Sequence, residues 1–377
     1  MGPRYPSLSW AFEQNPTLHN LLLASYQPAP HYLRLLDGLT RTLHRLNVAG
    51  VQRKILEIGP NNLSKFRSTV SEFRVAEFLA LNGMDTELLS DNYLPGKSPD
   101  ILAVDSLGEH YVEVARFSDD EIVEYVRGRV TGFLENVTPA YRVDILLSYE
   151  LSKPAVEHQE RREKEEIAES VLEEFGRVIV GYGEFSASQS IIIEGVEFQI
   201  SKSPIPRGFV GTVTTEPIVL QSGQFSDRIR FLVTDPTYGK AIKRESWKGA
   251  DRSKYYTIAI AVEQPFFDFD SAINPLLGSR THYSSRPPKV DVPPFVKEAS
   301  AKGWNSFLET VHLIPKGNTI FTSYGAFLTN AICKNVSGVL VLAENRKLWL
   351  PNPFVSEEIN NPGLVRFLNN DPRKDFQ

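Results

Sequence analysis

Three acidic residues, Glu72, Asp100 and Glu113, have types and spacing that could bind a metal ion. Glu113 lies in the stretch YVEVARF, where flanking valines indicate a mostly buried strand. Asp100 opens the preceding strand, so a hairpin would bring both carboxylates to neighbouring positions at one end of a sheet. Adjacent carboxylates repel each other unless a cation lies between them, and Mg²⁺ prefers oxygen ligands of this kind. The pattern therefore favours a site for a divalent cation.

Helices and strands around these acids must position them. The expected elements are a helix at about 62–82, strands at 101–105 and 111–117, a helix at about 119–135 and a buried strand at 142–151. Glu72 lies beside the apolar stripe of the first helix and could deliver a third carboxylate. The strongly charged segment 154–175 is expected to be a helix with a solvated face.

The second half of the chain is expected to be rich in strands. Segments such as SIIIEGVEFQI and RIRFLVTD predict an antiparallel β region at 177–234. The stretches YYTIAIAVEQP and SGVLVLAENRKLWLPNPF predict further strands, the last of which would extend the central sheet. We expect an α/β protein in four parts: an N-terminal helical segment at 1–60, a core at 61–176, a β-rich region or insertion at 177–234, and a C-terminal α/β segment at 235–377.

The order of the acidic motifs resembles the PD-(D/E)XK nuclease superfamily. The matching pieces span 71–120 and are SE at 71–72, AEFL at 76–79, Gly83, PD at 99–100 and VEV at 112–114. The resemblance implies a restriction-endonuclease-like mixed sheet flanked by helices. It also implies that Asp100 and Glu113 hold Mg²⁺ or Mn²⁺, that Glu72 completes or orients the site, and that the protein hydrolyses DNA phosphodiester bonds.

Ala115 departs from this pattern, because the family's lysine would belong there. Losing one preorganised electrostatic donor costs about 10²- to 10³-fold in rate, so the three acids could still support slow hydrolysis. Alternatively, another cation fills the vacancy. The candidates nearby in sequence are Lys97, Arg74, Arg127 and Arg129, whereas Arg116 points to the opposite face of the strand.

Two other classes of function remain open. One is a catalytically inactive nuclease-fold protein that binds nucleic acid or a protein partner. The other is an α/β protein unrelated to nucleases, in which the hairpin carries its acids by chance.

A basic stretch at 240–254 is a second candidate functional segment. It contains six basic residues against two acidic ones, in a chain whose net charge is −5. Basic groups interleaved with aromatic ones can hold a phosphate backbone and stack a base. The expected DNA contacts are Lys240, Lys243, Arg244, Trp247, Lys248 and Arg252. The alternative is an exposed amphipathic helix leading into the strand YTIAIAV.

The composition limits the remaining possibilities. The single cysteine, Cys333, excludes a disulfide framework within the chain and a cysteine-based zinc cage. No apolar run approaches the length of a membrane span, and the first residues lack the apolar core of a signal peptide. We therefore expect a cytoplasmic protein without a membrane partner, and the sequence leaves a homo-oligomer open.

Overall fold

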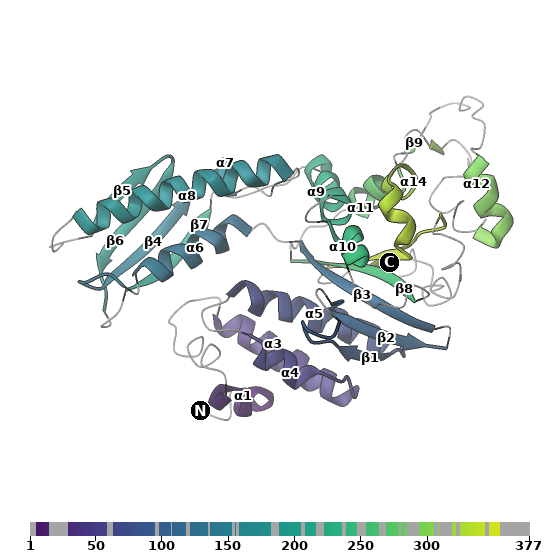
Figure 1. Cartoon of the computed structure of the whole chain (residues 1–377), viewed down its shortest axis with the longest axis horizontal. Coiled ribbons are helices and arrows are strands. Elements are labelled where there is room, and N and C mark those ends of the chain that lie inside the picture. Colours follow the sequence, from purple (N-terminus) through teal and green to yellow (C-terminus); the bar gives the residue numbers. More distant parts are fainter. Residues whose placement is uncertain are drawn as a thin grey trace. The chain divides into compact units, whose positions relative to one another are not determined.

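The chain folds as an α/β protein with helices packed around mixed β-sheets (Figure 1). This computed structural model describes residues 5–14, 29–58, 63–94, 98–106, 108–117, 121–134, 136–152, 155, 158–181, 188–204, 208–215, 222–235, 239–246, 254–263, 269–278, 280–282, 284, 294–304, 308, 319–321, 325–343 and 347–354. Within these residues, no helical segment has the length and hydrophobicity of a membrane span.

The chain groups into two compact units, each made of several segments. Unit 1 comprises Met1–Arg41, Ile55–Val70 and Ser118–Leu220, and unit 2 comprises Thr42–Lys54, Ser71–Phe117 and Gln221–Gln377. The four parts predicted from the sequence are divisions along the chain, whereas these units are groupings in space, so the predicted boundaries stay a prediction. All three candidate acids belong to unit 2.

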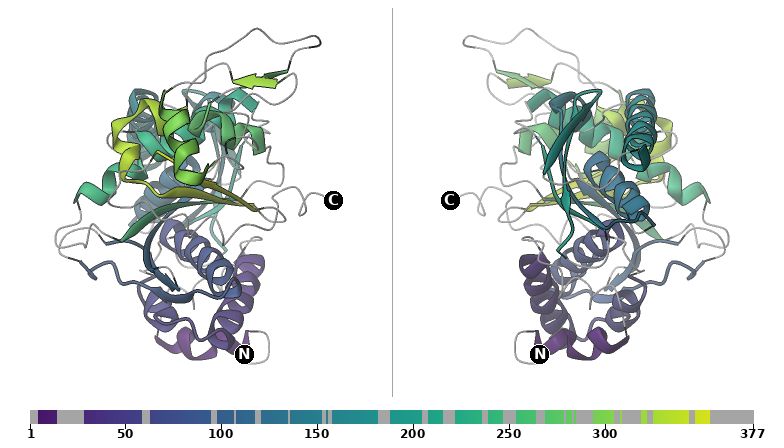
Figure 2. Two further views of the ribbon diagram at one scale, coloured as in Figure 1. Left: turned by 90° about the vertical axis from the view of Figure 1, so that its right-hand side faces the viewer. Right: turned by 90° about the vertical axis from the view of Figure 1, so that its left-hand side faces the viewer.

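A six-stranded sheet in the order β1-β2-β3-β8-β11-β12 is the centre of unit 2. Its strands are β1 (Asp85–Leu88), β2 (Ile101–Asp105), β3 (Gly108–Phe117), β8 (Tyr255–Val262), β11 (Gly338–Leu342) and β12 (Lys347–Pro351). β1, β2 and β3 form an antiparallel meander, β3, β8 and β11 are parallel, and β12 is antiparallel to β11. The further views show β11 and β12 continuing the sheet beyond β8 (Figure 2). The predicted extension of the central sheet by this last hairpin is confirmed.

Central strands of this sheet are apolar because helices and neighbouring strands cover them. β8 is buried at every residue except Tyr255, as expected of a strand between two parallel neighbours. The helices of unit 2 include α9 (Ser222–Thr234), α10 (Lys240–Ser246), α11 (Phe269–Leu276), α12 (Pro294–Ala299), the π-helix η2 (Ser300–Trp304), α14 (Ala326–Thr329) and the 3-10 helix η3 (Ala331–Asn335). A two-stranded pair joins β9 (Arg280–His282) to β10 (Thr319–Phe321). Figure 1 shows α10 beside α9 and close to β8, and the lysines of α10 contact Glu113 in the middle of β3.

The N-terminal part of the chain is helical. Its elements are the 3-10 helix η1 (Pro6–Leu8), α1 (Ser9–Gln14), α3 (Ala29–Arg45), α4 (Val51–Leu56) and α5 (Leu63–Leu81). The helix predicted at about 62–82 is α5, and Gly83 follows it with a positive φ of 86°. Glycine is suited to this position because residues with a side chain rarely adopt such a conformation.

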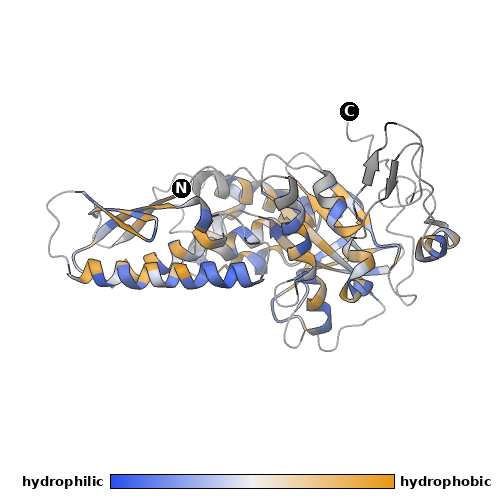
Figure 3. Cartoon of the chain, turned by 90° about the horizontal axis from the view of Figure 1, so that it is seen from above, coloured by the Kyte–Doolittle hydropathy of each residue, from blue (hydrophilic) through white to orange (hydrophobic). Residues whose placement is uncertain are grey.

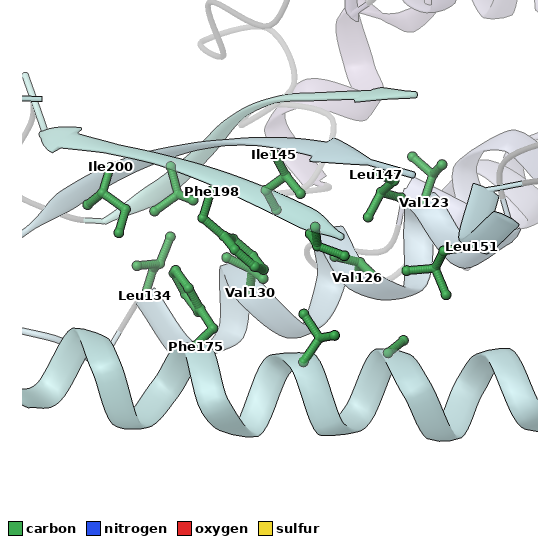
Figure 4. Packing of buried hydrophobic residues seen from close by; sticks show 14 of the residues in the cluster. Val123, Val126, Val130, Leu134, Ile145, Leu147, Leu151, Phe175, Phe198 and Ile200 are labelled. Atoms are coloured by element: carbon green, nitrogen blue, oxygen red, sulfur yellow. The ribbon is translucent and has the colours of Figure 1, made fainter. Parts of the chain in front are cut away.

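Unit 1 contains a separate sheet in the order β5-β6-β4-β7. Its elements are α6 (Glu121–Leu134), β4 (Tyr141–Leu147), α7 (Tyr149–Ser152), α8 (His158–Gly181), β5 (Gln189–Ile193), β6 (Val196–Lys202) and β7 (Phe209–Thr215). Helices α6 and α8 cover one face of the sheet, and Phe175 of α8 stacks on Phe198 of β6 with ring centroids 4.3 Å apart (Figure 4). In α8, Ala168, Val171, Phe175 and Ile179 are buried at helical spacing while the residues between them are exposed or half-buried, so the predicted solvated face is confirmed, and hydrophilic residues alternate with hydrophobic ones along the helix (Figure 3).

Three details of the strand prediction for 177–234 are wrong. The stretch RIRFLVTD belongs to α9, where Ile229 and Val233 are both buried one turn apart, and this spacing fits a helix better than a strand. In addition, β7 pairs with β4 in parallel, so the region is not purely antiparallel. Residues 177–181 are the last turn of α8.

Candidate active site

Asp100 lies beside Glu113 at the start of β2. β2 begins at Ile101, which pairs with Val112 of β3, so Asp100 lies just before this antiparallel ladder. The main-chain N–H of Asp100 donates to the carbonyl of Val112 at 3.1 Å, which holds Asp100 next to the residue that precedes Glu113. The negative charge of Glu113 contributes to the raised pKa of Asp100, as expected of neighbouring carboxylates. The Asp100 carboxylate also accepts a hydrogen bond of 2.6 Å from the main-chain N–H of Val114.

Glu113 is fully buried and is neutralised by two lysines of α10. Its Oε1 accepts a hydrogen bond of 2.7 Å from Lys240 Nζ and a second, shorter one from Lys243 Nζ. Burial would raise the pKa of Glu113, but the charges of the two ammonium groups outweigh it and hold the pKa below its usual range. Burial likewise opposes the charged form of Lys240, and the negative charges of Glu113 and Asp100 nevertheless raise the pKa of that lysine. The pair is therefore ionised at neutral pH.

The other oxygen of Glu113 is in a different position. Oε2 is buried and has no hydrogen-bond partner among the residues that the structure describes. A buried carboxylate oxygen without a partner is costly, because it has lost its water without gaining a donor. This atom therefore marks a place where a cation or a polar group of a ligand would be stabilising.

Main-chain contacts hold α10 in the position that delivers its lysines. Arg244 donates to the carbonyl oxygens of Asn335, at 2.5 Å, and Lys254, at 2.9 Å, and its guanidinium lies over the ring of Tyr256. The Tyr256 hydroxyl donates to the main-chain carbonyl of Lys240. Because Lys240 and Lys243 are three residues apart, their side chains leave the same face of the helix. The helix is thus held at its first residue by Tyr256 of β8 and near its last turn by Lys254 and Asn335, and it presents both ammonium groups to β3.

Glu72 reaches the same group of charges from α5. It is 2% exposed, and its Oε2 lies 2.9 Å from Nζ of Lys54. Its charge is felt at Asp100: burial first, and then the negative charges of Glu113 and Glu72, raise the pKa of Asp100 to about 7. All three predicted acids are therefore electrostatic neighbours, and their catalytic and metal-binding roles stay predictions.

The positive charges at the site come from an element that the sequence analysis did not connect to it. Ala115 is buried, with 1% of its surface exposed, and follows Glu113 on the same face of β3. Of the substitutes considered for the missing lysine, Lys97 lies outside the described residues, and Arg129 pairs with Glu169 in unit 1 at 2.9 Å. The signal that was available is the pair of lysines in KAIK, one helical turn apart and just before a buried strand.

The predicted DNA contacts fall into two groups. Lys240, Lys243 and Arg244 lie in α10, where the lysines contact Glu113 and the arginine contacts main-chain carbonyls. The remaining three, Trp247, Lys248 and Arg252, lie outside the described residues. A role in DNA contact stays a prediction for all six.

Asp100 and Glu113 carry the kind of oxygen donor that a divalent cation takes. Within the described residues, no group of three or more His, Cys, Asp or Glu side chains has an arrangement that would hold a metal ion. Mg²⁺ commonly uses only one or two carboxylates and completes its shell with water and substrate phosphate. The unpartnered Glu113 Oε2 and the raised pKa of Asp100 both indicate a place where added positive charge is stabilising. In comparisons with protein-family models, curated proteins and solved structures, no match to this chain was found.

Proposed function

We propose that this chain is a Mg²⁺-dependent nuclease with a restriction-endonuclease-like core that hydrolyses DNA phosphodiester bonds. The observation that carries the proposal is the contact of Lys240 and Lys243 with Glu113, whose two neighbours in β3 are hydrogen-bonded to Asp100. The resemblance in sequence calls for two acids and a lysine around one phosphate. The lysine absent at Ala115 is supplied by α10.

Each side chain has a role that follows from its position. Asp100 and Glu113 would hold Mg²⁺, which when bound lowers the pKa of a water molecule and neutralises charge on the phosphate oxygens. Lys240 and Lys243 place ammonium groups at the same carboxylate, within reach of a phosphate bound beside it. A positive charge fixed there stabilises the negative charge that develops on the phosphate in the transition state. Glu72, paired with Lys54, orients the site from α5.

A second candidate function is a catalytically inactive nuclease-fold protein that binds nucleic acid or a protein partner. One observation favours it: Glu113 is already neutralised by two lysines, so a metal ion would have to share this carboxylate with them. An inactive protein could keep such a closed ion cluster purely for stability. The two candidates differ in whether Asp100 is needed for a chemical step.

Cleavage of supercoiled and linear DNA in Mg²⁺ or Mn²⁺ tests the proposal. Asp100→Asn should abolish cleavage, and Lys240→Met should lower the rate by about 10²- to 10³-fold, the usual cost of losing one preorganised donor. The matched control is Glu245→Gln, which removes an exposed carboxylate from the same helix and should leave the rate unchanged. Far-ultraviolet circular dichroism confirms that each variant is folded.

Two outcomes would contradict the proposal. A wild-type protein that binds DNA but cleaves none with any divalent metal would favour the inactive candidate. Cleavage that persists in Asp100→Asn would place the activity outside this site.

A further inference from the structure

A buried lysine on α4, Lys54, forms an ion pair with Glu72. Lys54 is 1% exposed, and its Nζ lies 2.9 Å from Glu72 Oε2 and 3.3 Å from Asp91 Oδ1. Glu72 is as deeply buried as the lysine, whereas the Asp91 side chain is 58% exposed. The shorter and more deeply buried of these two contacts is therefore with the acid that the resemblance would assign to the metal site.

A close backbone contact between the start of α4 and β1 fixes the position of Lys54. Leu88 N–H in β1 donates to the carbonyl of Ala49 at 2.9 Å, and a parallel bridge joins Ala49 to Glu87. Gly50 follows with a φ of +82°, and a Cβ there would lie 2.1 Å from the carbonyl oxygen of Leu88. Only glycine fits so close to the strand. α4 begins at the next residue, which fixes Lys54 one turn further on.

Lys54 remains charged in this buried position. Burial would lower its pKa, but the carboxylates of Glu72 and Asp100 outweigh this and raise the pKa. Among the described residues, the buried side chains of Glu72 and Glu113 and the neighbouring Asp100 bring three carboxylates together with the ammonium groups of Lys54, Lys240 and Lys243, while the exposed Asp91 contacts Lys54 from outside. Lys54 forms an ion pair with Glu72, and Lys240 and Lys243 form ion pairs with Glu113. Asp100 is the carboxylate that no lysine contacts among the described residues.

We propose that Lys54 is a positioning residue that holds Glu72 out of the metal coordination shell, so that the site takes one divalent cation on Asp100 and Glu113. This inference rests on the proposed function and specifies its metal stoichiometry. A carboxylate paired with a buried ammonium group is a poor ligand, because the metal would have to displace the lysine from an environment without water. The ammonium charge also repels a second dication.

Binding of Mn²⁺ to the full chain, measured by electron paramagnetic resonance of the free ion and by calorimetry, tests the inference without an activity assay. The wild type should bind one ion. Lys54→Met should bind Mn²⁺ at least about tenfold more tightly, because a positive charge next to the site has gone and Glu72 is released. Lys54→Arg keeps the charge and should restore the wild-type affinity. Lys334→Met removes an exposed lysine of η3 and controls for the change in net charge.

The double variant Lys54→Met/Glu72→Gln decides the question if Lys54→Met does not fold. It replaces the ion pair with two neutral side chains, so no buried charge is left without a partner. The inference predicts one Mn²⁺ with an affinity close to that of the wild type, because Glu72 is not a ligand. A loss of more than about tenfold would make Glu72 a ligand and overturn the inference.

The remaining outcomes separate the two proposals. Unchanged affinity in a folded Lys54→Met would also overturn the positioning role, and two ions in the wild type would overturn the stoichiometry. A wild type that binds no Mn²⁺ would remove the proposed nuclease function itself, and this inference with it.

Discussion

Replacing Asp100 with Asn should change how the stability of the metal-free protein depends on pH. The folded protein raises the pKa of Asp100 from an ordinary value of 3.8 to about 7, through burial and the neighbouring charges of Glu113 and Glu72. The folded state therefore holds a proton at Asp100 more tightly than the unfolded state does. This contribution to stability is fully present below about pH 4 and is lost as the pH rises through about 7. A pKa difference of about three units corresponds to at most about 4 kcal/mol of stability. Because Asp100 is partly exposed, we expect an effect of at least about 2 kcal/mol.

Urea unfolding in EDTA at pH 5, 6, 7 and 8 measures the effect. The wild type should lose stability relative to Asp100→Asn over this range, because the amide never ionises. Taking the difference between the two proteins cancels the titration of all other groups. Asp227→Asn, which removes an exposed carboxylate from α9, controls for the loss of one charge. A difference between wild type and Asp100→Asn that stays flat from pH 5 to 8 would refute the electrostatic coupling of the three acids.

The other predictions concern the metal, the backbone and the basic stretch. Mg²⁺ at about 100 times its dissociation constant should raise the free energy of unfolding of the wild type by about 2.7 kcal/mol at pH 8, and should raise that of Asp100→Asn far less; equal gains would place the metal elsewhere. Gly50→Ala should lower the free energy of unfolding in urea by about 1–3 kcal/mol, because Gly50 has a positive φ and a Cβ there would lie 2.1 Å from the carbonyl oxygen of Leu88. The control is Gly38→Ala, where a Cβ would meet no atom within 4 Å. A loss no larger than that of the control would contradict the steric argument. Replacing Lys248 and Arg252 together with Ala should make the salt dependence of duplex binding shallower by about two units, measured by fluorescence anisotropy, if both contact phosphates; an unchanged slope would make this segment an ordinary solvated one.

The adjacency of Asp100 and Glu113 was accessible from sequence because it depends on local structure. A short turn joins β2 to β3, so the hairpin register follows from the spacing of the two strands. The helical position of Glu72 was likewise readable from the apolar spacing of α5. By contrast, the error at RIRFLVTD arose because a short apolar run fits either a strand or a helix, and packing inside unit 2 decided for the helix.

The partners of the acids were not accessible in this way. Lys240 is 127 positions from Glu113, and unit 1 contributes most of the chain between them. Lys54 and Glu72 are closer in sequence but lie on different helices, and their contact depends on the glycine that presses α4 against β1. Neither contact leaves a short-range pattern. A lysine that serves a distant carboxylate resembles any surface lysine until the fold is known.

The contrast between acids and lysines has a physical cause. The carboxylates of Asp100 and Glu113 are short side chains whose positions follow from the hairpin of β2 and β3 and the hydrogen bonds at its start, so their motif must be local. A lysine carries a compact charge on a flexible four-carbon stem, and its attraction to a carboxylate depends on distance far more than on direction. Many elements that pass near Glu113 could therefore supply that charge, and here α10 supplies two. The alanine at position 115 therefore says little about whether the site is active, because a lysine elsewhere in the chain can supply the positive charge that the motif places at this position. The test that matters is the removal of the charge itself, at Lys240, with Glu113 and Asp100 left in place.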